Sequence, residues 1–131
     1  MSFVGSEALA STLGPNGDGV YITQVVPVPE GDEIPLLAEY RKALIANDST
    51  ARPSFGSLEG YIAGRLTAKI LAEAGDDPTR ESFLSALINT KSFDIGGFTL
   101  KYDKGDNRGS DQVFMTVIRQ GNVVPADRLT P

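Results

Sequence analysis

Large apolar residues recur at every fourth position in the middle of the chain. These residues are Leu58, Ile62, Leu66 and Ile70. A spacing of four places them on one face of an α-helix, so we expect an amphipathic helix over residues 58–74. Ser57 is placed to serve as its N-cap, and Gly75 is placed to end it.

The same kind of spacing predicts helices before and after this one. We expect them over residues 7–13, 35–46 and 78–89. Ser6 and Asp77 are the expected N-caps of the first and the last. A proline opens the second and the third, which suits the first turn of a helix because the N–H of that position has no partner within the helix.

Two segments rich in β-branched residues, 20–26 and 113–118, are apolar on both faces. Such strands are typical of sheets that are covered on both sides, most often parallel sheets. Residues 98–102 instead alternate between apolar and polar side chains, which predicts a half-buried strand. The glycines within residues 95–97 indicate a bulge or sharp bend, and residues 120–124 indicate a hairpin.

This set of elements predicts an α/β fold that the chain does not complete by itself. Each amphipathic helix needs another layer to bury its apolar face, because ordering a residue costs about 1–2 kcal/mol. The chain supplies two or three strong strands against four helices, and it lacks parallel neighbours for its two doubly apolar strands. We therefore expect its sheets to be completed by further polypeptide or by a second copy.

Composition excludes several classes of function. The 131-residue chain has a net charge of −5 and no basic cluster, so nucleic-acid binding is not expected. No apolar run approaches the roughly 20 residues that a membrane-spanning helix needs. The chain contains no Cys and no His, which removes the usual general base, the thiolate nucleophile and the commonest metal ligand. No cofactor is expected.

Residues 103–110 form a polar stretch that we interpret as a solvated turn. A calcium-binding loop is the alternative. The stretch lacks the distal Glu and the ligand register of such a loop, so the pattern favours the turn.

Three stretches of the sequence together resemble one protein family. They are residues 19–27 (GVYITQVVP), 53–61 (PSFGSLEGY) and 96–100 (GGFTL), the last followed by Asp103 and by Gly105-Asp106. The chain resembles the carboxy-terminal third of solute-binding proteins of branched-chain amino-acid-type ABC transporters, which have the type I periplasmic binding protein fold. The resemblance runs through nearly the whole chain, and residues 53–61 are its most specific part.

The resemblance implies an α/β fold with two lobes that close around a ligand by hinge motion. It assigns residues 1–27 to the second lobe and residues 28–108 to the helices and the returning strand of the first lobe. Residues 109–131 then form the final strand and hairpin of the second lobe. Hinge segments are implied at residues 27–29 and 109–112, where backbone torsions would absorb the closure.

The resemblance also implies a ligand site. An amino acid needs a carboxylate for its ammonium group and an apolar wall for its side chain. Glu7 aligns with the position that accepts the ammonium, Phe55 aligns with a cleft aromatic, and Ser6 and Ser54 are nearby hydrogen-bond donors. Each residue has a structural alternative: Glu7 as a first-turn acid, Phe55 as a hydrophobic staple, and both serines as cap or turn residues. These alternatives stay open at this point.

By this resemblance the chain is a fragment of an extracytoplasmic solute-binding protein, in the periplasm or at the cell surface, and is not an enzyme. It would capture a branched-chain or related amino acid, or a small aromatic acid, and deliver it to the permease of an ABC importer. We expect it to associate with its missing amino-terminal portion or with itself. The alternatives are a ligand-sensing regulatory domain of the same fold and a stand-alone small α/β module.

Overall fold

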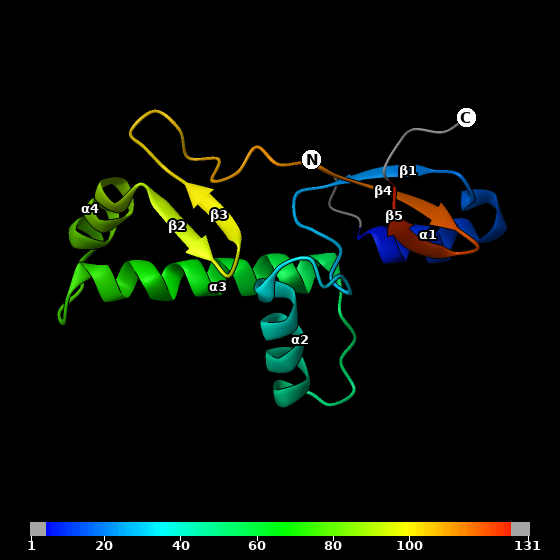
Figure 1. The fold of residues 1–131 in the computed structure, drawn as a ribbon, viewed down its shortest axis with the longest axis horizontal. Coiled ribbons are helices and arrows are strands. Elements are labelled where there is room, and N and C mark those ends of the chain that lie inside the picture. The colour runs from blue at the N-terminus through cyan, green and yellow to red at the C-terminus, as the bar shows by residue number, and fades with distance from the viewer. Residues whose placement is uncertain (1–4, 127–131) are drawn as a thin grey trace.

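The computed structural model describes residues 5–126, and this chain forms two parts (Figure 1). The sheet part contains α1 (Ser6–Leu13), a short 3-10 helix (Gly14–Gly17), β1 (Tyr21–Gln24), β4 (Phe114–Arg119) and β5 (Asn122–Pro125). The helical part contains α2 (Pro35–Asn47), α3 (Phe55–Ala74), α4 (Arg80–Thr90), β2 (Ser92–Ile95) and β3 (Phe98–Lys101). No helix within the described range is both long enough and apolar enough to cross a membrane.

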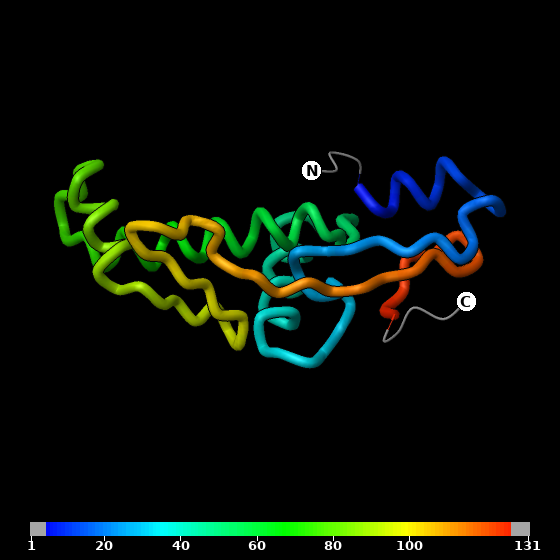
Figure 2. The backbone as a smooth tube through the Cα atoms, turned by 90° about the horizontal axis from the view of Figure 1, so that it is seen from above, coloured from blue at the N-terminus to red at the C-terminus, as the bar shows by residue number. Residues whose placement is uncertain are grey.

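Two crossing segments join the parts. Residues 25–34 lead from β1 to α2, and residues 102–113 lead from β3 to β4. The chain that leaves β1 and the chain that enters β4 run side by side as they pass between the parts (Figure 2). The assignment of the residue ranges to two lobes of a receptor stays a prediction.

The sheet part holds an antiparallel sheet with the order β1-β4-β5. Its register pairs Tyr21 with Val117 and Gln24 with Phe114. The two strands that we expected to lack neighbours therefore pair with each other, and the expectation of parallel neighbours was wrong for this pair. An apolar pattern on both faces reports burial of side chains, but it carries no information on the direction of the hydrogen-bonded neighbour.

Coverage of these two strands is also less complete than we expected. Val25 and Val113, which continue the apolar runs beyond the paired residues, are 60% and 64% exposed within the described chain. Val117 and Ile118 on β4 are buried. β4 is therefore buried at its centre, β1 is only partly covered where it pairs, and both strands are open where they approach the helical part.

The hairpin between β4 and β5 confirms its prediction. Gln120 and Gly121 have φ values of 51° and 79°. Two consecutive positive φ values are typical of the tight turn whose twist matches the twist of the flanking strands.

The central helix α3 begins three residues earlier than predicted. Ser54, not Ser57, is its N-cap: its backbone is extended, and its side chain accepts a hydrogen bond from the Ser57 backbone N–H. The helix ends at Ala74, and Gly75 follows with φ 94°, as expected. Both serines are residue types that cap helices well. The hydrogen bond from the Ser57 backbone N–H to the Ser54 side chain identifies Ser54 as the cap.

Two other cap predictions were wrong. Thr79, not Asp77, caps α4, and it forms a capping box with Ser82 in which each side chain accepts from the backbone of the other residue. Gly5 precedes α1, so Ser6 is its first residue and not its cap. The prediction for α2 is confirmed, because the helix begins at a proline and ends at Asn47.

β2 and β3 form a hairpin that the sequence predicts only in part. The alternation of β3 is confirmed, since Phe98 and Leu100 are buried while Thr99 and Lys101 are exposed. Of the expected bulge or sharp bend, the structure shows the bend: it is the hairpin turn, in which Gly96 and Gly97 have φ values of 66° and 91°, and β2 was not predicted. β2 is as short as β3 and also alternates polar and apolar residues, with Phe93 and Ile95 buried, so its alternation was a usable signal that the prediction missed.

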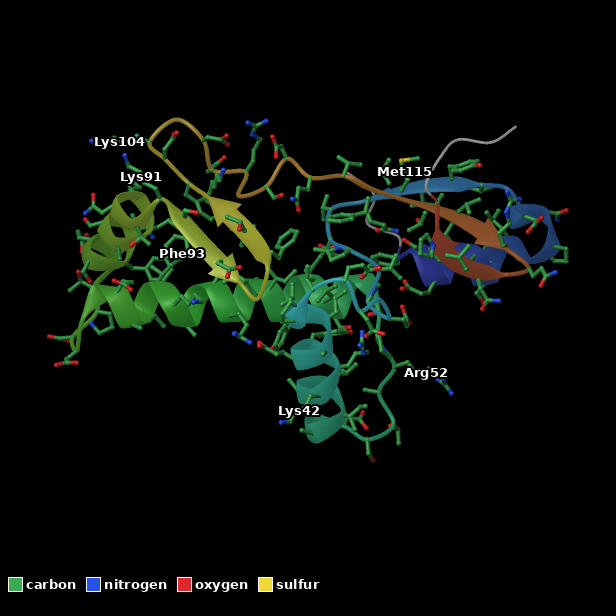
Figure 3. All side chains as sticks on the ribbon, in the orientation of Figure 1. Lys42, Arg52, Lys91, Phe93, Lys104 and Met115 are labelled. Carbon is green, nitrogen blue, oxygen red and sulfur yellow. The ribbon has the colours of Figure 1, made fainter. Side chains whose placement is uncertain are left out.

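The principal core lies in the helical part. Its buried residues are Val26, Leu36, Leu37, Tyr40, Phe55, Leu58, Ile62, Ile70, Phe93, Ile95, Phe98 and Leu100. The predicted face of α3 supplies three of them, and β2, which carries the buried Phe93, packs on that helix (Figure 3). Lys42 and Arg52 point away from both parts into solvent (Figure 3).

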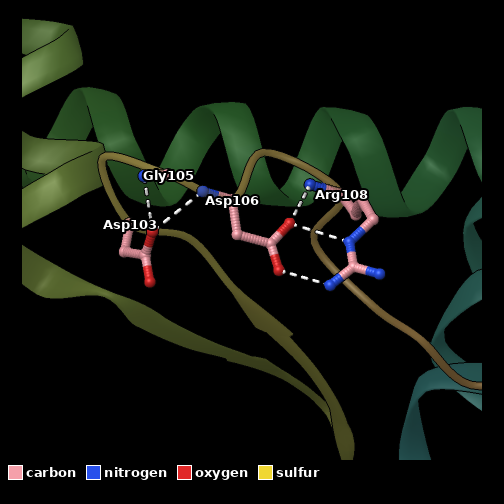
Figure 4. A network of polar contacts seen from close by, with 4 residues as sticks. All are labelled: Asp103, Gly105, Asp106 and Arg108. Carbon is pink, nitrogen blue, oxygen red and sulfur yellow. Dashed lines mark hydrogen bonds and ion pairs between the residues drawn. The ribbon is translucent and has the colours of Figure 1, made fainter.

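In the loop after β3, Asp103 and Asp106 accept hydrogen bonds from groups of the same loop. The Oδ1 atom of Asp103 accepts from the backbone N–H groups of Gly105 and Asp106 at 2.6 and 2.8 Å (Figure 4). The carboxylate of Asp106 accepts from Nε and Nη2 of Arg108 at 2.9 and 2.7 Å. In the part of the chain that the structure describes, no three acidic side chains gather into a group that could hold a metal ion.

Candidate functional site

Glu7 and Phe55 meet where the two parts of the molecule join. Glu7 lies in the first turn of α1, and Phe55 is the first residue of α3. The Oε1 atom of Glu7 accepts a hydrogen bond from the backbone N–H of Phe55 at 3.3 Å, across 48 positions of sequence. The first N–H groups of a helix have no partner within it, and the helix dipole favours an anion there, so this contact is favourable in two ways.

Ser54 is held at the same junction by α2. Its backbone N–H donates to the hydroxyl oxygen of the buried Tyr40 at 3.0 Å. That hydroxyl also lies 2.5 Å from the Ser57 hydroxyl. The cap interpretation of Ser54 is therefore confirmed, and Tyr40 is the residue that ties the start of α3 to α2.

The side chain of Phe55 is buried in the core and only 5% exposed. The staple interpretation was wrong, because a staple uses the residue before the N-cap and Phe55 follows it. The backbone of Phe55 faces Glu7, while its ring belongs to the core. Its role as the wall of a ligand site stays a prediction.

Ser6 is buried beside Glu7, and it pairs with a residue that the sequence analysis did not select. The Nε2 atom of Gln24, the last residue of β1, donates to Oγ of Ser6. The sequence predicts Gln24 only as part of an apolar strand. A polar residue within a β-branched run was the signal that could have drawn attention to it, whereas nothing in the local sequence singles out the hydroxyl of Tyr40.

Two of the cavities that border the crossing segments have largely apolar side chains in their linings. One, of about 320 Å³, lies between α3, β3 and the start of the first crossing, and its lining includes Val26, Ile62 and Leu66. The other, of about 510 Å³, is bordered by both crossing segments and by β4, with Val28, Phe98 and Phe114 in its lining. Neither lining includes Glu7 or Phe55, and the Glu7 side chain is exposed in the described chain, so its carboxylate is open to solvent.

The junction offers binding chemistry. The exposed carboxylate of Glu7 has acceptor capacity beyond its one contact with Phe55, so it can accept from a ligand ammonium group. None of the four ion pairs within residues 5–126 involves Glu7. Its negative charge is therefore not neutralised by a cationic side chain of the described residues.

A family model described as "Periplasmic binding protein" matches residues 1–122 of the sequence. The chain belongs to the periplasmic binding protein family. No match was found among the curated proteins.

Solved structures of this kind are similar to the chain over nearly its whole length. A possible leucine/isoleucine/valine-binding protein from Rhodopirellula baltica is 36% identical with a TM-score of 0.86, and the match covers 95% of this chain and 34% of that protein. An extracellular ligand-binding receptor from Verminephrobacter eiseniae is 27% identical with a TM-score of 0.81, covering 94% and 36%. A substrate-binding periplasmic protein from Ralstonia solanacearum is 26% identical with a TM-score of 0.82, covering 95% and 36%.

These similarities confirm the resemblance that the sequence motifs predicted and the α/β fold class that came with it. This periplasmic binding protein chain spans about a third of the solved structures that it matches, with coverage of 34–36%. The exposed Val25 and Val113 and the open junction at Glu7 are consistent with a portion of a larger two-lobed fold.

Proposed function

We propose that this chain is part of an extracytoplasmic solute-binding protein that captures a small ligand by hinge closure. The proposed ligand is a branched-chain or related amino acid, or a small aromatic acid. Delivery to the permease of an ABC importer is part of the proposal, and the chain binds rather than catalyses. The observation that carries the proposal is the position of the Glu7 carboxylate, which faces the start of α3 from the other part of the molecule.

Each site residue has a role in this proposal. Glu7 accepts the ligand ammonium, and the edge of Phe55 borders the ligand side chain. Ser54 and Ser6 hold the starts of the two helices, because their hydroxyls are already engaged with Ser57 and Gln24. The groups that bind the ligand carboxylate lie in polypeptide outside this chain, which is why the junction is open.

Hinge closure in this proposal uses the two crossing segments. Gly109 is tied to β3, because its carbonyl oxygen accepts from the backbone N–H of Lys101 at 2.7 Å. Bending would therefore concentrate between residues 110 and 112, beside residues 27–29 of the other crossing. Closure requires the ligand to bind the closed form more tightly than the open form, since equal affinity shifts nothing.

Calorimetry tests the proposal in a receptor that carries this chain together with its amino-terminal portion. Leucine, valine and small aromatic acids form the ligand panel. Glu7→Gln should weaken amino-acid binding by about 1.5–3 kcal/mol, because a charge-assisted hydrogen bond is lost. Glu81→Gln, a first-turn acid on α4, is the matched control and should leave affinity unchanged. Equal affinity of the Glu7 variant and the native receptor would exclude the role of Glu7.

The isolated chain should bind these ligands weakly or not at all, and it should associate with the amino-terminal portion or with itself. Micromolar or tighter calorimetric binding by the isolated chain, or a dilute monodisperse monomer on size exclusion, would count against this view.

The second candidate, a ligand-sensing receptor, is favoured by one observation: a similar structure is described as an extracellular ligand-binding receptor. Cross-linking to a permease or to a signalling protein distinguishes the two.

A further inference from the structure

Three polar side chains are buried among the described residues: Ser6, Gln24 and Thr116. Two of them form one pair, in which Nε2 of Gln24 donates to Oγ of Ser6. Burying an amide without a partner is costly, so a buried pair of this kind holds its two residues in a defined relative position.

The pair joins two places that matter for the site. Gln24 ends β1 and is followed directly by the first crossing segment. Ser6 is the first residue of α1 and is the neighbour of Glu7. α1 has eight residues, and its N-cap Gly5 provides no side-chain hydrogen bond, so the start of this helix lacks the usual local anchor.

We propose that Gln24 is a positioning residue for the ligand-binding carboxylate. Through Ser6 it holds the first turn of α1 so that Glu7 faces the backbone N–H of Phe55. Gln24 directly precedes the first crossing segment, so the same pair also holds the start of α1 against the end of β1 where that segment leaves the sheet part. The relevance of this inference to ligand binding rests on the proposed function. The experiment that tests it uses no ligand.

A second buried polar contact in the same sheet provides a matched control. The hydroxyl of Thr116 on β4 donates to the carbonyl oxygen of Ile22 on β1 at 2.9 Å. Thr116→Val removes a buried hydrogen bond of the same part without changing the contact that reaches α1. A general loosening of the sheet would therefore show in this variant as well.

The experiment follows backbone amides of the full 131-residue chain by NMR while the pH falls from about 7 to about 3, a range in which carboxylates become protonated. The amide of Phe55 reports the Glu7 contact. The amide of Gly97, which donates to Oδ1 of Asp94 at 2.7 Å, is the internal reference. In the native chain both amide shifts should change with pH, and Glu7→Gln should abolish the change at Phe55 alone.

Gln24→Leu and Ser6→Ala should each abolish the pH-dependent shift of Phe55 and leave that of Gly97. The double variant should lose no more than either single variant, and Thr116→Val should keep both shifts.

If Gln24→Leu fails to fold, Ser6→Ala decides alone. An unchanged Phe55 response in the folded variants overturns the proposal, and so does a loss of that response in Thr116→Val. A native chain in which Phe55 does not respond also overturns it. A receptor that binds amino acids equally well with and without Glu7→Gln would contradict the proposed function. That result would leave the NMR test of the Gln24–Ser6 pair unaffected.

Discussion

The carboxylate of Glu7 and the backbone N–H of Phe55 form a 3.3 Å hydrogen bond between α1 and α3. The contact places an anion at the start of a helix of 20 residues. It is also a contact between the two parts of the molecule. We propose that the same carboxylate also accepts a hydrogen bond from the ligand ammonium. The ligand and α3 would then share one acceptor, the Glu7 side chain.

The charge of Glu7 should stabilise the chain, and the charge of Glu73 should not. Glu7→Gln is expected to lower the free energy of unfolding by about 0.3–1 kcal/mol, because it removes an anion from the positive end of α3. Glu73→Gln in the last turn of the same helix should have the opposite sign, since an anion there opposes the dipole. Urea unfolding of both variants measures the difference. Two changes of the same sign would contradict the helix-dipole explanation.

Tyr40 should be important for stability through its hydroxyl as well as its ring. Tyr40→Phe leaves the backbone N–H of Ser54 without its acceptor, and we expect a loss of about 1–3 kcal/mol in the free energy of unfolding. Tyr61→Phe is the matched control. The Tyr61 hydroxyl accepts from Nη1 of Arg65, which keeps Glu39 as a partner, so the expected loss is about 0.5–1 kcal/mol. Equal losses in denaturant unfolding would remove the special role of Tyr40.

Gly109 should tolerate a side chain less well than Gly121. Both have positive φ, at 80° and 79°, so alanine carries a conformational cost of about 1–2 kcal/mol at either position. A Cβ at Gly109 would also lie 2.6 Å from the hydroxyl oxygen of Tyr102, whereas nothing lies within 4 Å of one at Gly121. We expect Gly109→Ala to cost about 1–3 kcal/mol more in unfolding free energy. Equal melting temperatures for the two variants would contradict the close approach to Tyr102.

The ion pair in the loop after β3 should show in the titration of Asp106. The hydrogen bonds from Arg108 lower the pKa of Asp106 from 3.8 to about 2. A carboxyl whose pKa is lowered by folding stabilises the fold above its unfolded pKa, and this contribution disappears as the pH falls through the folded value. The contribution is therefore present above about pH 4 and lost by about pH 2.

Arg108→Gln should raise the pKa of Asp106 toward its ordinary value, which NMR of the side-chain carboxyl can follow. The stability difference between the native chain and this variant should also vanish at acid pH. A native Asp106 that titrates at 3.8 would show that the pair does not persist in solution.

The local elements of this chain could be predicted from sequence because their causes are local. The four-residue spacing along α3 and the prolines and glycines at helix and turn boundaries act within a few positions. The choice between Ser54 and Ser57 as cap was missed, because the Tyr40 hydroxyl that contacts both comes from another helix. The family could also be predicted, since its motifs are stretches of consecutive residues.

Tertiary structure alone decided which segments meet. β1 and β4 pair across 90 or more positions, as in the contact of Thr116 with Ile22, and no local pattern encodes the direction or register of that pairing. The same holds for Glu7 beside Phe55 and for Gln24 beside Ser6. By itself the sequence determined the family and most of the helices and strands, although not β2, because spacing and motifs depend on residues that are close together in the chain. The position of the carboxylate at the start of α3 was decided only by folding, because it depends on contacts between parts that are distant along the chain.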